Sequence, residues 1–139
     1  MKIDIEYIKK ILDVALEHTQ PDFDIKHQDI KPLWETDELL SKLVFHMKIL
    51  EDQSLIESAL NSGGGLGFRR KADGRYSVAV TPLRLTATGH QFAADLKKSG
   101  VVEQLTTSFK DAGPKEMVNI VIGLGKKIVD KKMEDLFSD

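Results

Sequence analysis

The sequence predicts an α+β fold that is mainly helical. Apolar residues recur at helical spacing in several separate stretches, an extended run rich in β-branched residues lies at 76–85, and half of the ten glycines fall between residues 61 and 74. A glycine-rich segment between two extended runs is typical of a β-hairpin with a long turn. With 139 residues, we expect one compact domain and an appendage.

Two amphipathic helices come first. Asp4 is a suitable N-cap for the first, which should end near Thr19 because Pro21 disfavours helix at the residue before it. Residues 22–33 predict a loop with one short strand. Thr36 should cap the second helix, which runs to about Asp52. Its predicted buried stripe contains His46 and six apolar residues, Leu39, Leu40, Leu43, Val44, Met47 and Leu50.

The next segment is predicted to form the hairpin. Residues 55–60 are one strand, residues 61–74 are a long turn without regular structure, and residues 76–85 are the returning strand. The far side of the turn is basic. It carries Arg69, Arg70, Lys71 and Arg75.

A third helix should follow the returning strand directly. Either Thr86 or a capping box of Thr88 and Gln91 can begin it. Phe92, Ala93 and Leu96 define its buried face, whereas Gln91, Asp95, Lys97 and Lys98 are expected on the solvent side.

Two further helices are predicted at the C-terminus. One starts after Gly100 and stops near Gly113, and Pro114 suits the first turn of the last. Part of the last helix is apolar nearly all round, so this helix should close over the core or bury a face against a second subunit. Gly123 and Gly125 would let another helix approach closely.

The order helix, helix, strand, turn, strand, helix is that of a winged helix-turn-helix. Residues 1–98 would form this domain, and residues 99–139 a helical extension that mediates dimerisation. One feature is irregular, because residues 20–35 leave little room for the short helix that usually precedes the recognition helix.

Three segments resemble a family of small bacterial and phage proteins classed as a domain of unknown function: residues 4–12, 45–56 and 85–92. That family shows an aromatic-His-Leu-x-x-Leu helix before a Gly-Leu-Ile strand, and later Leu-Thr-Trp-Glu-Gly-His-x-Phe. Here Ala87 and Thr88 replace Trp-Glu, and Ser54 replaces the glycine. The resemblance carries no activity, and its motif residues are interpreted as structural: His46, Thr86, Gly89, His90 and Phe92.

Several functional classes are disfavoured. The chain has no cysteine and no Gly-x-Ser-x-Gly elbow, and its glycine clusters do not match a phosphate loop, so we expect no enzyme activity and no cofactor. A metal site would need His18 or His27 beside other ligands, and no His-x-x-x-His spacing exists. We interpret His46 and His90 as paired buried residues. The N-terminus lacks a secretory pattern, which favours a cytoplasmic protein with no membrane segment.

The basic turn is the main functional signal. The net charge is only −2, so nucleic-acid binding would need a local patch. We predict a transcriptional regulator of phage or mobile-element type that binds double-stranded DNA as a homodimer. Its contacts would come from Arg69, Arg70, Lys71 and Arg75, with Lys42 and Lys48 on the second helix. The alternative is a protein-interaction module without DNA binding, because the second helix is acidic overall.

Overall fold

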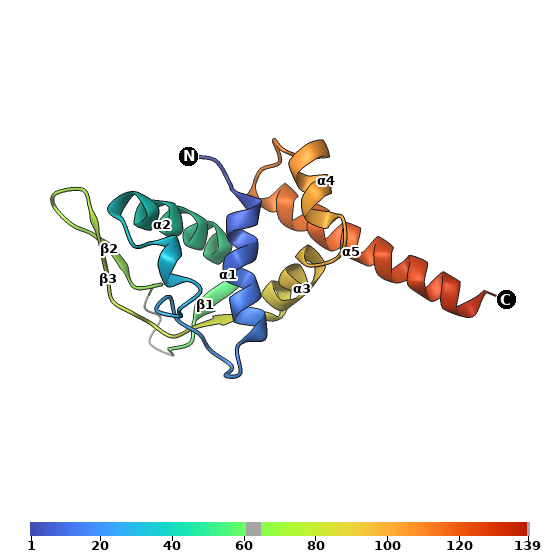
Figure 1. Ribbon diagram of the computed structural model, residues 1–139, viewed down its shortest axis with the longest axis horizontal. Helices are drawn as coiled ribbons and strands as arrows, with labels where there is room; N and C mark the ends of the chain where they lie inside the picture. Colours follow the sequence, from blue (N-terminus) through green and yellow to red (C-terminus); the bar gives the residue numbers. More distant parts are fainter. Residues whose placement is uncertain (61–64, 139) are drawn as a thin grey trace.

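The computed structural model describes residues 1–60 and 65–138. It has α+β architecture and is mainly helical, as predicted (Figure 1). The helices are α1 (Ile5–Glu17), the short 3₁₀ helix η1 (Lys31–Leu33), α2 (Asp37–Asp52), α3 (Ala87–Leu96), α4 (Val101–Ser108) and α5 (Pro114–Phe137). The strands are β1 (Ile56–Ser58), β2 (Phe68–Arg70), β3 (Tyr76–Val78) and β4 (Leu83–Leu85).

Both predicted N-caps of the first two helices are confirmed. The Asp4 carboxylate accepts a hydrogen bond from the Tyr7 N–H at 3.1 Å, and the Thr36 hydroxyl accepts one from the Leu39 N–H at 3.1 Å. Each bond satisfies a donor that the first helical turn leaves without a partner. The residues between these helices contain η1, and Phe23 pairs with Leu83 as an isolated bridge. The predicted short strand is therefore reduced to one residue.

The strands form two antiparallel pairs. β1 pairs with β4, with Ile56 opposite Leu85, and β2 pairs with β3, with Phe68 opposite Val78. Residues 61–64 of the predicted turn lie outside the described part of the chain. The prediction that the whole segment 61–74 lacks regular structure is wrong for β2. Phe68 packs on the core edge opposite Val78, and this apolar pairing brings the chain back into an extended strand.

Thr86 is the N-cap of α3, and the alternative capping box of Thr88 and Gln91 does not start the helix. The Thr86 hydroxyl accepts a hydrogen bond from the Gly89 N–H at 2.9 Å and donates to the carbonyl of Leu55 at 3.3 Å. A Cβ atom built on Gly89 would lie 1.9 Å from the same carbonyl oxygen. Thr86 and Gly89 therefore allow α3 to start directly against the chain that enters β1. Phe92 is fully buried.

The core lies between α1, α2, α3 and the β1–β4 pair, and α4 with the first half of α5 covers it. Asp95 of α3 contradicts the predicted solvent face, because its side chain is only 1% exposed. Its carboxylate accepts hydrogen bonds from Lys98 at 2.7 Å and Gln91 at 2.9 Å. Gly125 makes the burial possible, since a Cβ there would lie 2.2 Å from the Asp95 carboxyl carbon.

Two parts of the chain project from this body in opposite directions. Figure 1 shows the β2–β3 hairpin at one end and the C-terminal half of α5 at the other. The first half of α5 contributes Met117, Val118 and Val121 to the core, so the last helix closes over the core along part of its length only.

Candidate nucleic-acid interface

The β2–β3 hairpin carries the four predicted cations within seven residues. Arg69 and Arg70 belong to β2, and Lys71 and Arg75 flank the tip, where the Lys71 N–H donates to the Arg75 carbonyl at 2.7 Å. Gly74 turns the tip in the left-handed conformation, with φ +86°. All four side chains belong to exposed residues. The structure thus gathers the basic residues on one projecting ribbon, as the sequence predicted.

Arg70 is held in one orientation by its cross-strand partner. Its guanidinium carbon lies 4.8 Å from the centroid of the Tyr76 ring, and its two terminal nitrogens donate to the Tyr76 hydroxyl and the Gly74 carbonyl, both at 3.2 Å. This contact was not predicted from the sequence, although the hairpin register that places residue 70 opposite residue 76 would have indicated it.

Arg75 connects the hairpin tip to α2. Its Nε lies 3.6 Å from Asp37 and 3.9 Å from Asp73, and all three side chains are more than half exposed. Exposed ion pairs of this kind contribute about 0–1 kcal/mol, so Arg75 can exchange these partners for another anion. The pairing also reduces the negative charge at the start of α2.

Arg69 and Lys71 are the two cations available for a ligand. Neither side chain makes a hydrogen bond or an ion pair with another residue of the described chain. Arg69 and Arg70 are consecutive strand residues, so their side chains point to opposite faces of the ribbon. An anion approaching the hairpin would therefore meet Arg69 on one face and the fixed guanidinium of Arg70 on the other.

The two lysines predicted on α2 differ in availability. Lys48 is exposed, but Lys42 is bound by its own fold: its Nζ lies 2.8 Å from the Asp4 carboxylate and 4.6 Å from the Tyr7 ring centroid. A contact of Lys42 with nucleic acid would therefore have to replace this ion pair, whereas a contact of Lys48 would not. The exposed residues of α2 are mostly acidic, namely Asp37, Glu38, Glu51 and Asp52.

His46 is a structural residue, as predicted. It is fully buried, its Nδ1 donates to the Lys42 carbonyl at 2.8 Å, and its Nε2 accepts from the Asp4 N–H at 2.9 Å. Burial lowers the pKa of His46. The hydrogen bond to the Lys42 carbonyl and the charge of Asp4 act in the opposite direction, but burial outweighs them. Burial raises the pKa of Asp4, but the Lys42 ammonium and the Tyr7 N–H outweigh it and leave this pKa lowered.

His90 does not share this role. Its side chain belongs to an exposed residue, so the expectation that it is buried beside His46 is wrong. In the segment 85–92, Thr86, Gly89 and Phe92 each have a structural role, as the cap of α3, the close approach to Leu55 and a core side chain. The described contacts give His90 no such role.

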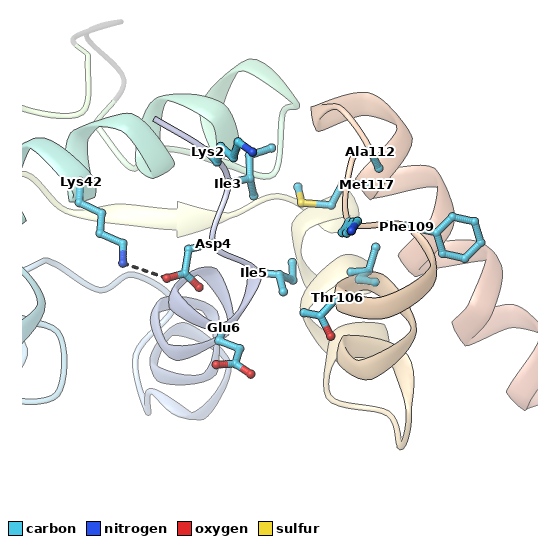
Figure 2. A pocket seen from close by; sticks show the side chains of 12 residues that line it. Lys2, Ile3, Asp4, Ile5, Glu6, Lys42, Thr106, Phe109, Ala112 and Met117 are labelled. Atoms are coloured by element: carbon cyan, nitrogen blue, oxygen red, sulfur yellow. Dashed lines mark hydrogen bonds and ion pairs between the residues drawn. The ribbon is translucent and has the colours of Figure 1, made fainter.

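A cleft lies away from the hairpin. It has a volume of about 530 Å³ and separates residues 2–6 from the α4–α5 connection, with Ile5, Leu105 and Met117 among its apolar lining (Figure 2). The Asp4–Lys42 ion pair lies at one side of it. Within the described chain, every buried side-chain nitrogen and oxygen has a hydrogen-bond partner, so no buried, unpartnered polar side chain marks this cleft as a site.

His18 and His27 are brought together, as a metal site would require. Their ring centroids are 5.7 Å apart, and the Asp29 N–H donates to His27 Nδ1 at 3.1 Å. Residues 1–60 and 65–138 contain no group of three or more histidine, cysteine or acidic side chains placed to hold a metal ion. The pair has no third ligand there.

Comparison with protein-family models, curated proteins and solved structures finds no significant match to this chain. No helix among the described residues is long and apolar enough to cross a membrane.

Proposed function

We propose that the chain is a DNA-binding protein of the winged-helix class, with the β2–β3 hairpin as its wing and α2 in the position of the recognition helix. The order of α1, α2, the hairpin and α3 supports this class, as does the bridge between Phe23 and β4, which adds a third, one-residue strand beside β1 and β4. The 3₁₀ helix η1 would replace the short helix that usually precedes the recognition helix.

The observation that carries the proposal is the projecting hairpin. Arg69 and Lys71 are exposed on it, and the guanidinium of Arg70 is oriented by its contact with Tyr76. Lysine and arginine side chains on such a ribbon can reach phosphate oxygens without reading the sequence. The acidic surface of α2 meets phosphate poorly, so the wing would supply most of the affinity. Base contacts would be limited to Ser41, Phe45 and Lys48 of α2. A regulatory role of phage or mobile-element type is the biological setting we propose.

Fluorescence anisotropy with a labelled random duplex tests the proposal. We expect binding at 50 mM salt that weakens steeply by 200 mM, because each phosphate contact releases counterions. The double variant Arg69→Ala/Lys71→Ala should reduce the slope of log affinity against log salt by about 2. The matched control Lys110→Ala/Lys115→Ala removes the same charge from exposed residues at the α4–α5 connection and should keep the slope. Equal slopes for the two double variants would overturn the role of the wing.

The second candidate is a protein-interaction module, and the acidic surface of α2 favours it. Asp37 and Glu38 are exposed at the start of α2 and Glu51 and Asp52 at its end, with the half-buried Phe45 between them. The variant Glu38→Lys/Asp52→Lys separates the two candidates. If α2 approaches DNA, this variant binds random duplex more tightly than the wild type. If the surface serves a protein partner only, neither the wild type nor the variant binds duplex.

We also propose that the functional unit is a homodimer joined through α5, since exposed apolar residues gather on the C-terminal half of this helix.

A further inference from the structure

The C-terminal half of α5 leaves the body of the protein with its apolar residues uncovered. From residue 126 to residue 138 every residue is exposed except the half-buried Ile128. The large apolar side chains on this segment are Val129 (42% exposed), Met133 (51%), Leu136 (77%) and Phe137 (76%). A helical segment of this length is marginal in water on its own, so it needs a partner surface.

These apolar residues form one stripe. Val129, Met133 and Leu136 are separated by four and then three residues, and Ile122 precedes Val129 by two turns, so all four lie along the same side of α5. The core residue Val118 lies on this same side, one turn before Ile122, whereas Met117 and Val121 lie on a neighbouring side. The stripe thus continues, beyond the end of α3, a side of α5 that the chain itself covers near its start.

The stripe continues into a groove between α3 and α5. This groove has a volume of about 380 Å³, and Ile122, Gly125 and Val129 line it together with Gln91 and Lys98 of α3. The segment of α5 beyond the groove has no α3 beside it (Figure 1). An apolar side chain that extends the stripe from outside could enter the groove at this point.

We propose that a second copy of this chain covers the stripe, with the two α5 helices antiparallel and Val129 of each copy beside Met133 of the other. This register places Leu136 of the second copy beside Lys126, at the groove, and Phe137 of the second copy level with Gly125. The most exposed apolar residues of one copy would thus lie at the groove of the other. The inference rests on the proposed homodimer and adds its geometry.

The charges along the segment favour this orientation. Lys126 and Lys127 lie near its start, and Glu134 and Asp135 lie near its end. Antiparallel packing places each lysine pair level with the acidic pair of the other copy, whereas parallel packing places like charges side by side. Between these ends, Asp130 reduces the charge of Lys131 and Lys132. Self-complementarity of this kind is what a symmetric pair requires of its surface.

Light scattering on the full chain tests whether the stripe is the interface. We expect twice the mass of one chain for the wild type, and one chain mass for Met133→Asp. The control Val80→Asp, which places the same charge on another exposed apolar residue, should keep the dimer. Val129→Asp should also give the monomer while the circular dichroism spectrum is unchanged, because Val129 is exposed in one chain and would be covered only by the second copy. A monomeric wild type, or a dimer that survives both α5 changes, would overturn the interface.

Cross-linking tests the register independently, because the chain has no cysteine of its own. Val129→Cys and Met133→Cys chains are mixed and oxidised. Antiparallel packing predicts that the mixed Val129–Met133 disulfide predominates. A predominant Met133–Met133 disulfide would overturn the antiparallel geometry but leave the dimer intact. Loss of duplex binding in the earlier titration would affect neither result, so failures of the dimer and of DNA binding are distinguishable.

Discussion

The contact between Gly89 and Leu55 gives the sharpest prediction about stability. In Gly89→Ala the new Cβ would lie 1.9 Å from the Leu55 carbonyl oxygen and 2.8 Å from its carbon, and both are backbone atoms that cannot rotate away. This oxygen also accepts a hydrogen bond from the Thr86 N–H at 3.0 Å, so moving it weakens the junction between β1 and α3.

The magnitude follows from three contributions. Replacing glycine by alanine inside a helix stabilises by about 1 kcal/mol. Overpacking costs about 3 kcal/mol where the neighbour is rigid, and a weakened hydrogen bond costs about 1 kcal/mol. We therefore expect Gly89→Ala to lower the free energy of unfolding by about 3 kcal/mol. With a urea m-value of about 2 kcal/mol/M, the midpoint should fall by about 1.5 M.

Urea unfolding followed by circular dichroism measures this change. The matched control is Gly123→Ala, the same substitution in a helix with nothing within 4 Å, which should raise the midpoint by about 0.5 M. Both changes are made on the Met133→Asp background, so that association does not contribute. A Gly89→Ala midpoint equal to or above that of the background protein would refute the close approach of α3 to Leu55.

Two further predictions concern buried polar groups. The pKa of His46 is lowered in the folded protein, so the unfolded chain binds a proton first as the pH falls. The free energy of unfolding should therefore decrease below about pH 6.5, by at most about 1.4 kcal/mol per pH unit. It should level off once His46 is also protonated in the folded protein. His46→Gln should remove that dependence in denaturant titrations across this range, and an unchanged pH profile would contradict the neutral, buried imidazole. Gly125→Ala should destabilise the protein because the new Cβ meets the Asp95 carboxyl group. In a double-mutant cycle, Asp95→Ala/Gly125→Ala should lose less stability than the sum of the two single variants. Strict additivity would contradict the contact.

The helices were predictable because their signals are local. Asp4, Thr36 and Thr86 each precede an apolar stripe at helical spacing, and each forms the cap that its hydroxyl or carboxylate allows. The hairpin was predictable in its existence but not in its extent, since the pairing of Phe68 with Val78 depends on a core edge that a single strand does not encode.

The errors all concern contacts between distant elements. Asp95 carries a charge on a helix, which favours an exposed position, and its burial depends on a glycine thirty positions later. The ion pair of Lys42 was not foreseen because its partner, Asp4, is the N-cap of another helix, α1. His46 and His90 were both expected to be buried, but only His46 faces the core. Patterns along the chain therefore located the basic hairpin, whereas the availability of each cation required the structure.

The proposed function depends most directly on whether the β2–β3 hairpin binds phosphate. A single anisotropy titration of random duplex at 50 mM salt tests this, with the wild type beside Arg69→Ala/Lys71→Ala and Lys110→Ala/Lys115→Ala. We predict saturable binding by the wild type and by the Lys110→Ala/Lys115→Ala control, and a loss of at least tenfold in affinity for the hairpin variant. No binding by the wild type, or equal loss in both variants, would contradict the proposed DNA-binding wing.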